Sequence, residues 1–159
     1  MALAPYYLGD TSALARLNRP EVADRLDPLL EAGLVARCTP TDLEAGFTST
    51  SPSSHRTMRR MRSAWPFVAM DQSVLDRSVE VQDALAERSQ QRGVKIADLL
   101  IGAAAEAAGL VVLHYDHDFD RIAEITGQAT EWIILAGTVP APCPDPSEMC
   151  NWRATRPRT

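Results

Sequence analysis

The chain has 159 residues, of which 45% are hydrophobic and 23% charged, a composition typical of one globular domain that buries a core without disulfides or a structural metal. Its 16 basic and 21 acidic residues give a net charge of −5, which argues against non-specific binding to nucleic acid or anionic lipid. Because no run of about 18 apolar residues occurs and the first residues lack a basic leader, we expect a cytoplasmic protein with no membrane partner.

Hydrophobic residues alternate along the chain between short strand-like runs and helical spacing, which predicts an α/β fold with a mostly parallel sheet. Up to residue 47 the predicted elements are a strand at 5–9, helices at 12–17 and 20–33, a strand at 34–38 and a helix at 42–47. Asp10 or Thr11 is placed to cap the first helix, and Thr39-Pro40-Thr41 supplies a turn and a cap for the third.

Residues 54–65 (SHRTMRRMRSAW) predict a short, basic and amphipathic helix. Met58, Met61 and Trp65 recur at i, i+3 and i+7 on one side, and the arginines take the remaining sides. The apolar side either packs into the core or forms a groove for another chain. The basic side either binds phosphate groups or is simply solvated.

The second half of the chain holds the most apolar segments. The predicted elements are a strand or extended link at 66–70, a long helix at 71–92, an apolar helix at 95–109, a strand at 110–115, a helix at 116–126 and a strand at 130–135. We therefore predict about five strands in one domain over 1–140, followed by a Pro-rich tail at 141–159.

Four acidic residues are expected at one edge of the sheet. Asp10 follows the first predicted strand, and Asp116 follows the strand at 110–115. Glu44 lies early in the helix after the strand at 34–38, and Asp98 opens the helix at 95–109. Because helices that return between parallel strands begin at the strands' carboxyl edge, these four carboxylates converge there.

Converging carboxylates without a cation would repel one another, and a hard divalent cation resolves the conflict. Mg²⁺ and Mn²⁺ prefer oxygen ligands, activate a bound water and neutralise charge on a phosphodiester. We expect Asp10, Asp98 and Asp116 as ligands, with Glu44 ligating or orienting the attacking water. Each acid also has a plainer interpretation: an N-cap for Asp10, a helix-dipole partner for Asp98, a capping box for Glu44 and a turn residue for Asp116.

Four motifs resemble the PIN-domain ribonucleases and, within them, the VapC-type toxins of bacterial toxin–antitoxin pairs. From about Tyr7 to about Ile125 the chain carries, in order, LGDTSAL, PTDLE, IADLLIGAAA and LHYDHDFDRIA. The resemblance implies a three-layer α/β/α fold and a Mg²⁺- or Mn²⁺-dependent endoribonuclease that cleaves structured cellular RNA, such as tRNA or rRNA, to inhibit translation and growth.

Site residues carry over from the family by position. Asp10, Glu44, Asp98 and Asp116 match its four acids, Asp118 matches a further acid near the metal, and Thr11 matches a hydroxyl residue beside the first acid. The chain departs from the pattern at one position, because His114 stands where many relatives have Thr or Ser. Whether His114 assists or is a core residue stays open.

The resemblance also implies partners. These are the RNA substrate, a cognate VapB-like antitoxin and a second copy of the chain in a homodimer, and the RNA-binding candidates are Arg56, Arg59, Arg60 and Arg62. Two alternatives remain: a non-catalytic PIN-like binding module, and a Mg²⁺-dependent phosphatase of the haloacid dehalogenase type. The phosphatase expects a D-x-D opening, but Thr11 and Ser12 follow Asp10.

Overall fold

The structure is a computed structural model, and it describes residues 4–138. The predicted Pro-rich tail at 141–159 lies outside this range. Four parallel strands form one sheet in the order β2-β1-β3-β4. They are β1 (Tyr7–Gly9), β2 (Val35–Ala36), β3 (Val111–His114) and β4 (Thr130–Trp132). The predicted α/β class with a parallel sheet is confirmed.

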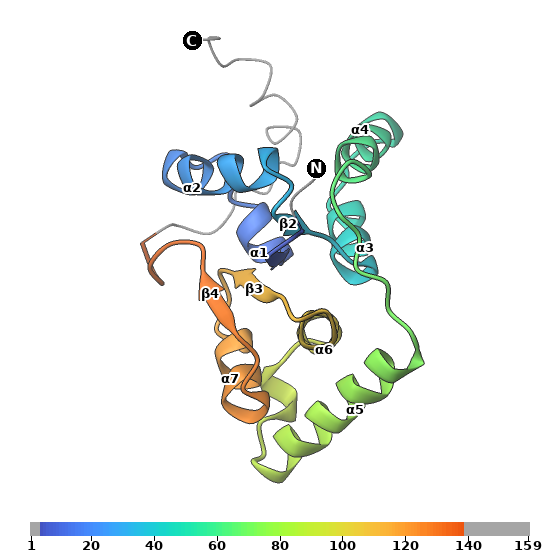
Figure 1. The fold of residues 1–159 in the computed structure, drawn as a ribbon, viewed down its shortest axis with the longest axis vertical. Helices are drawn as coiled ribbons and strands as arrows, with labels where there is room; N and C mark the ends of the chain where they lie inside the picture. The colour runs from blue at the N-terminus through green and yellow to red at the C-terminus, as the bar shows by residue number, and fades with distance from the viewer. Residues whose placement is uncertain (1–3, 139–159) are drawn as a thin grey trace.

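Helices connect and cover the strands, as Figure 1 shows. They are α1 (Thr11–Leu14), α2 (Pro20–Glu31), α3 (Thr39–Phe47), α4 (Pro52–Arg62), α5 (Gln72–Glu87), the 3-10 turn η1 (Gln91–Gly93), α6 (Ile96–Ala108) and α7 (Asp118–Thr126). The long helix predicted at 71–92 is shorter than expected, because Ser89 adopts a left-handed conformation with φ of 57°. No helix in the described range is long and apolar enough to span a bilayer.

The sheet separates two apolar cores, because successive side chains of a strand point to opposite faces. Leu8, Ala36 and Val112 face a core shared with α5, α6 and α7. Val35 and Leu113 face the other core, which α1 and α2 cover. The molecule therefore has the predicted three layers, with α2 and α6 on opposite sides of the sheet in Figure 1.

The strand count differs from the prediction, since the described residues form four strands rather than about five. Residues 66–70 are mostly an extended link, and their ladder is reduced to a single parallel bridge between Phe67 and Arg37. The apolar run PFVAM is short, and exposure of Phe67 leaves it little burial to stabilise a longer edge strand. The sequence predicted either a strand or an extended link at 66–70, and the extended link is correct.

Strand order and a close approach between strands position the site. The chain leaves β1 toward β2 on one side of the sheet, and β3 pairs with the other side of β1. The order of the strands therefore reverses between β1 and β3, and their carboxyl ends flank this topological switch point. Gly9 ends β1 there, and a Cβ atom at this residue would lie 2.8 Å from Cγ1 of Val35. Only glycine lets β1 pass β2 this closely and deliver Asp10 to the edge.

Candidate active site

Three carboxylates converge at the carboxyl edge of the sheet, and we call them the carboxylate triad: Asp98, Asp116 and Asp118. One oxygen of each lies within 4.8 Å of an oxygen of the other two. Asp98 stands in the first turn of α6, Asp116 follows β3 by two residues, and Asp118 is the first residue of α7. Two helix N-termini and a strand end thus bring together three of the predicted metal ligands.

Asp10 lies beside the triad and links it to Glu44. It is 2% exposed, and one of its oxygens accepts a hydrogen bond from the Ser12 N–H at 2.8 Å. Burial raises the pKa of Asp10 to about 6, and the charge of Glu44 adds to the rise. The N-cap interpretation of Asp10 is thus correct, and it is compatible with a place among the clustered acids.

Glu44 does not belong to a capping box. Helix α3 begins at Thr39, three residues earlier than predicted, and the Thr41 hydroxyl accepts the Cys38 N–H at 3.1 Å. Glu44 therefore lies in the second turn of α3. Its Oε2 atom and the Thr11 Oγ1 atom are buried and have no hydrogen-bond partner among the described residues. Both residues line a shallow pocket between α1 and α3.

The pKa values of Asp98 and Asp116 are shifted in opposite directions. Burial raises the pKa of Asp98 to about 8, and the charges of Asp10 and Asp116 add to the rise while Lys95 opposes it. Burial also opposes ionisation of Asp116, but hydrogen bonds from the Lys95 ammonium and the Asp118 N–H outweigh it, so the pKa of Asp116 lies below its usual value. The site therefore holds more negative charge than its buried groups tolerate without a cation.

The donor set fits a hard divalent cation. All of the triad's ligand atoms are carboxylate oxygens, and the buried Asp98 Oδ2 accepts no hydrogen bond from the described residues. Oxygen-only ligands favour Mg²⁺ or Mn²⁺ over zinc or copper. The four acids that match the family all lie at this edge of the sheet. Only Asp98 and Asp116 among them, together with Asp118, are close enough to one another to bind the same ion, and Asp10 and Glu44 lie outside this triad.

Sequence reasoning missed three cations at this site. The Lys95 ammonium contacts Asp116 and lies 3.6 Å from Asp98 Oδ2 and 3.7 Å from Asp118 Oδ2. Arg121 Nη1 pairs with Asp118 Oδ1 at 3.1 Å, and the Arg16 guanidinium lies 4.2 Å from the centre of the Tyr115 ring. The available signal was spacing, because Lys95 and Asp98, like Asp118 and Arg121, stand three residues apart at a helix N-terminus.

His114 is a core residue. Its side chain is 0% exposed, and its ring lies 5.1 Å from that of Phe119 and 4.9 Å from that of Trp132. Burial lowers its pKa, which favours the neutral ring, and Nδ1 accepts the Asp116 N–H at 3.3 Å. His114 therefore helps to fix the backbone at Asp116 from inside the core.

The basic helix α4 is confirmed, but one of its arginines does not face solvent. Arg56, Arg59 and Arg60 are exposed. Arg62 is only 5% exposed, and it donates to Asp42 at 2.7 Å and to the Thr41 hydroxyl at 2.9 Å. The prediction for Arg62 is wrong because this residue follows Met58 by four positions and so lies on the apolar face of the helix. Three of the four RNA-binding candidates remain available.

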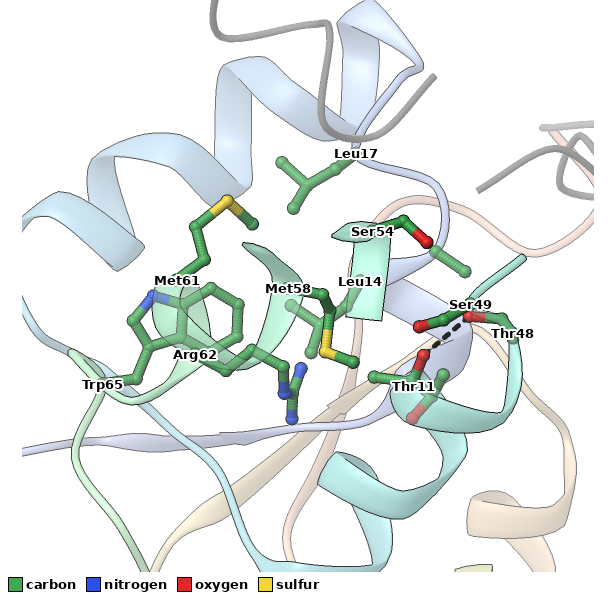
Figure 2. Close-up of a pocket in the computed structure, with 12 residues that line it drawn as sticks. Thr11, Leu14, Leu17, Thr48, Ser49, Ser54, Met58, Met61, Arg62 and Trp65 are labelled. Atoms are coloured by element: carbon green, nitrogen blue, oxygen red, sulfur yellow. Dashed lines mark hydrogen bonds between the residues drawn. The ribbon is translucent and has the colours of Figure 1, made fainter. Parts of the chain in front are cut away.

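An apolar pocket of about 70 Å³ lies between α1, α3 and α4 (Figure 2). Met58, Met61 and Trp65 line it from α4 and the turn that follows, and Leu14 and Leu17 line it from the opposite side. The predicted apolar face of the basic helix is therefore real. Thr11 lines both this pocket and the shallow pocket that contains Glu44, so the two adjoin.

The fold and the acidic site define a PIN domain. The family model described as "PIN domain" matches residues 7–125, which carry all five acids of the site. The chain belongs to this family, as the sequence motifs predicted. The family match removes the haloacid dehalogenase-type phosphatase as an alternative.

Named relatives are similar over nearly their whole length. Ribonuclease VapC21 of Mycobacterium tuberculosis (strain ATCC 25618 / H37Rv) is 47% identical over 133 residues, which are 83% of this chain and 96% of the relative. Ribonuclease VapC51 of the same strain is 48% identical over 137 residues, 86% of this chain and 99% of the relative.

Solved structures share the fold. DNA-bound VapBC from Salmonella typhimurium matches with a TM-score of 0.67 and 17% identity, covering 82% of this chain and 100% of that one. VapBC-5 from Mycobacterium tuberculosis, a member of the VapBC family of toxin–antitoxin systems, matches with a TM-score of 0.52 and 20% identity, covering 82% and 100%. At these identities the likeness establishes the three-layer architecture.

Proposed function

We propose that the chain is a divalent-metal-dependent endoribonuclease and the toxin of a toxin–antitoxin pair. The observation that carries the proposal is the carboxylate triad, with a buried Asp98 oxygen that accepts no hydrogen bond from the described residues, in a chain of the PIN family. Relatives named ribonucleases at 47% and 48% identity support RNA as the substrate. A non-catalytic binding module has no need of a strained acidic site at a switch point.

The triad would hold the metal, which we expect to be Mg²⁺ or Mn²⁺. A cation bound there supplies an activated water and neutralises charge on the phosphodiester. Asp10 adds negative charge beside Asp98 and anchors the start of α1. Glu44 lies close enough to Asp10 for its charge to act on it, and its buried Oε2 atom, which has no hydrogen-bond partner among the described residues, can accept a proton from a water or orient it.

Basic residues around the acids favour an RNA substrate. Arg16 lies near enough to Asp10 and Asp116 for their charges to act on it, and its guanidinium stacks on the Tyr115 ring. Exposed arginines of α4 extend the positive charge away from the site. Unpaired loops of a folded RNA such as tRNA or rRNA present the phosphates and bases that such groups bind.

The proposed partners are a VapB-like antitoxin and a second copy of the chain. Structural neighbours described as VapBC support the antitoxin. An antitoxin side chain with a positive charge would suit the triad in the same way that a metal does. The proposed target, RNA of the translation machinery, goes with a cytoplasmic location.

The decisive experiment measures cleavage of structured RNA by the metal-stripped chain with and without added Mn²⁺ or Mg²⁺. We expect cleavage only with metal, and a loss of more than about a hundredfold in Asp10→Asn and Asp116→Asn. Sequencing of RNA 5′ ends after brief expression identifies the target.

Asp120→Asn is the matched control, because Asp120 is a carboxylate of the same helix as Asp118 that pairs instead with His117. It should keep its activity. Full cleavage by a folded Asp116→Asn chain, or cleavage that persists in EDTA, would contradict the proposal. A chain that binds RNA without cutting it under any metal would establish the binding-module alternative.

A further inference from the structure

One cation reaches all three carboxylates of the triad. Lys95 caps the N-terminus of α6, and its Nζ atom contacts Asp116 while lying 3.6 Å from Asp98 and 3.7 Å from Asp118. Arg121, the other cation that pairs with the triad in the described part of the chain, contacts one of its three acids, Asp118, and also donates to the Gly93 carbonyl. The Lys95 ammonium therefore lies where the three carboxyl groups converge.

A divalent cation and the ammonium cannot share this point. The triad's oxygens lie within 4.8 Å of one another, and Mg²⁺ binds oxygen at about 2.1 Å, so an ion held by all three would occupy the space between them. Lys95 has the same oxygens as its partners. Binding of the metal and binding of the ammonium are thus mutually exclusive.

The Lys95 side chain is free to leave. It is 61% exposed, and an ammonium on a four-carbon stem exchanges carboxylates for water at small cost. Arg62 provides the contrast, since its side chain is 6% exposed and bound to Asp42 and Thr41. Breaking the Lys95 contacts therefore costs little, whereas breaking those of Arg62 would leave a buried charge without its partner.

We propose that Lys95 is a positioning residue that holds the triad together before the metal arrives. Its ammonium takes the place of the divalent cation in the metal-free chain and is displaced when the cation binds. This inference rests on the metal site of the proposed function. In addition to that site, Lys95 competes with the metal for the same carboxylates. The site is therefore assembled before the metal binds, and metal binding exchanges the ammonium for the divalent cation.

The composition of the chain makes the exchange directly observable, because Lys95 is its only lysine. Labelling with [13C]lysine therefore gives a single side-chain Cε–Hε signal in an NMR spectrum. We expect Mg²⁺ to shift this signal and to saturate the shift at the concentration at which calorimetry detects binding. The shift should persist in Arg92→Gln, a nearby exposed charge variant, and disappear in Asp98→Asn.

A Lys95 signal that stays unchanged while calorimetry on the same sample records Mg²⁺ binding would overturn the placeholder role. If Asp116→Asn then still abolished RNA cleavage, the nuclease proposal would stand without it. A chain that binds no Mg²⁺ by calorimetry would overturn both.

A second measurement uses the variant Lys95→Gln. Two unit charges 4 Å apart interact by about 1 kcal/mol in water, so removing the competitor should tighten Mg²⁺ binding by about fivefold. The Mg²⁺-induced rise in Tm should then be larger in Lys95→Gln than in the unaltered chain and in Arg92→Gln. Equal rises in all three chains would contradict the inference.

Discussion

Two ionic clusters with opposite designs lie on either side of β1. In the arginine clamp, made of Arg37, Asp42 and Arg62, one carboxylate is bound by two guanidinium groups, and Thr41 accepts a further hydrogen bond from Arg62. In the carboxylate triad the acids outnumber the cations, and an oxygen of Asp98 accepts no hydrogen bond from the described residues. The clamp balances its carboxylate with cations of the chain itself, whereas the triad holds more carboxylates than cations that pair with them.

The difference separates structure from function. A buried carboxylate bound by two guanidinium groups fixes the geometry of the chain, here the position of α4 against α3 through the Arg62 hydrogen bonds to Asp42 and Thr41. A cluster of buried acids that outnumber their cations costs stability, and such clusters are found at functional sites where a further cation binds. Burial of charge alone would not have distinguished the two clusters; the count of cations and the unsatisfied oxygen do.

The largest stability effect is expected in the clamp. Asp42→Ala leaves the Arg62 guanidinium buried without its carboxylate, and we expect a loss of about 3 kcal/mol in the free energy of unfolding. Urea denaturation measures it. Cleavage per folded molecule should change little, because Asp42 is turned toward α4 rather than toward the triad. A stable Asp42→Ala chain without nuclease activity would contradict the assignment of a structural role to the clamp and a functional role to the triad.

Removing a charge from the triad should raise the free energy of unfolding, whereas removing one from the clamp lowers it. Burial raises the pKa of Asp98 from 3.8 to about 8, so the folded chain binds a proton that the unfolded chain releases. Its contribution to stability is therefore full below pH 4 and falls as the pH rises toward 8. In EDTA at pH 8, the free energy of unfolding of Asp98→Asn should exceed that of the unaltered chain by several kcal/mol, since each unit of pKa shift is worth about 1.4 kcal/mol.

This difference should vanish near pH 4, where both side chains are neutral. Urea denaturation at a series of pH values gives the profile, and Asp120→Asn, a change of a half-buried carboxylate on α7 that pairs with His117, is the control. A gain for Asp98→Asn that is independent of pH, or a loss at pH 8, would contradict the pKa shift on which the prediction depends.

The smallest effects are expected on the outer face of α4. Single Arg59→Gln and Arg60→Gln changes should weaken binding of single-stranded RNA a few-fold and lower the salt dependence of log K by about 0.7 for each phosphate that is no longer neutralised. The measurement is made on the inactive Asp116→Asn chain. Arg88→Gln, at the exposed end of α5, should have no effect. An unchanged salt dependence would show that the exposed arginines of α4 are solvated and do not bind RNA phosphates.

Local patterns predicted most of the elements and their order. The helix at 95–109 is nearly the observed α6, and the strand at 110–115 contains β3, because long apolar runs and a terminal glycine define both. The weak pattern at 66–70 left the fifth strand undecided. The Arg62 prediction failed for a different reason, since a count of charges along the helix ignored the face on which each one lies.

By itself the sequence determined which end of the sheet the acids reach. Strands followed at once by Asp10 and Asp116, and an apolar helix opened by Asp98, place these residues at one edge of any parallel sheet, because connectivity fixes which end of a strand each of them follows. Only the tertiary structure decided the charges around them. Whether Lys95 reaches the triad and Arg62 is buried depends on packing between helices distant in sequence, and spacing along the chain does not encode those distances.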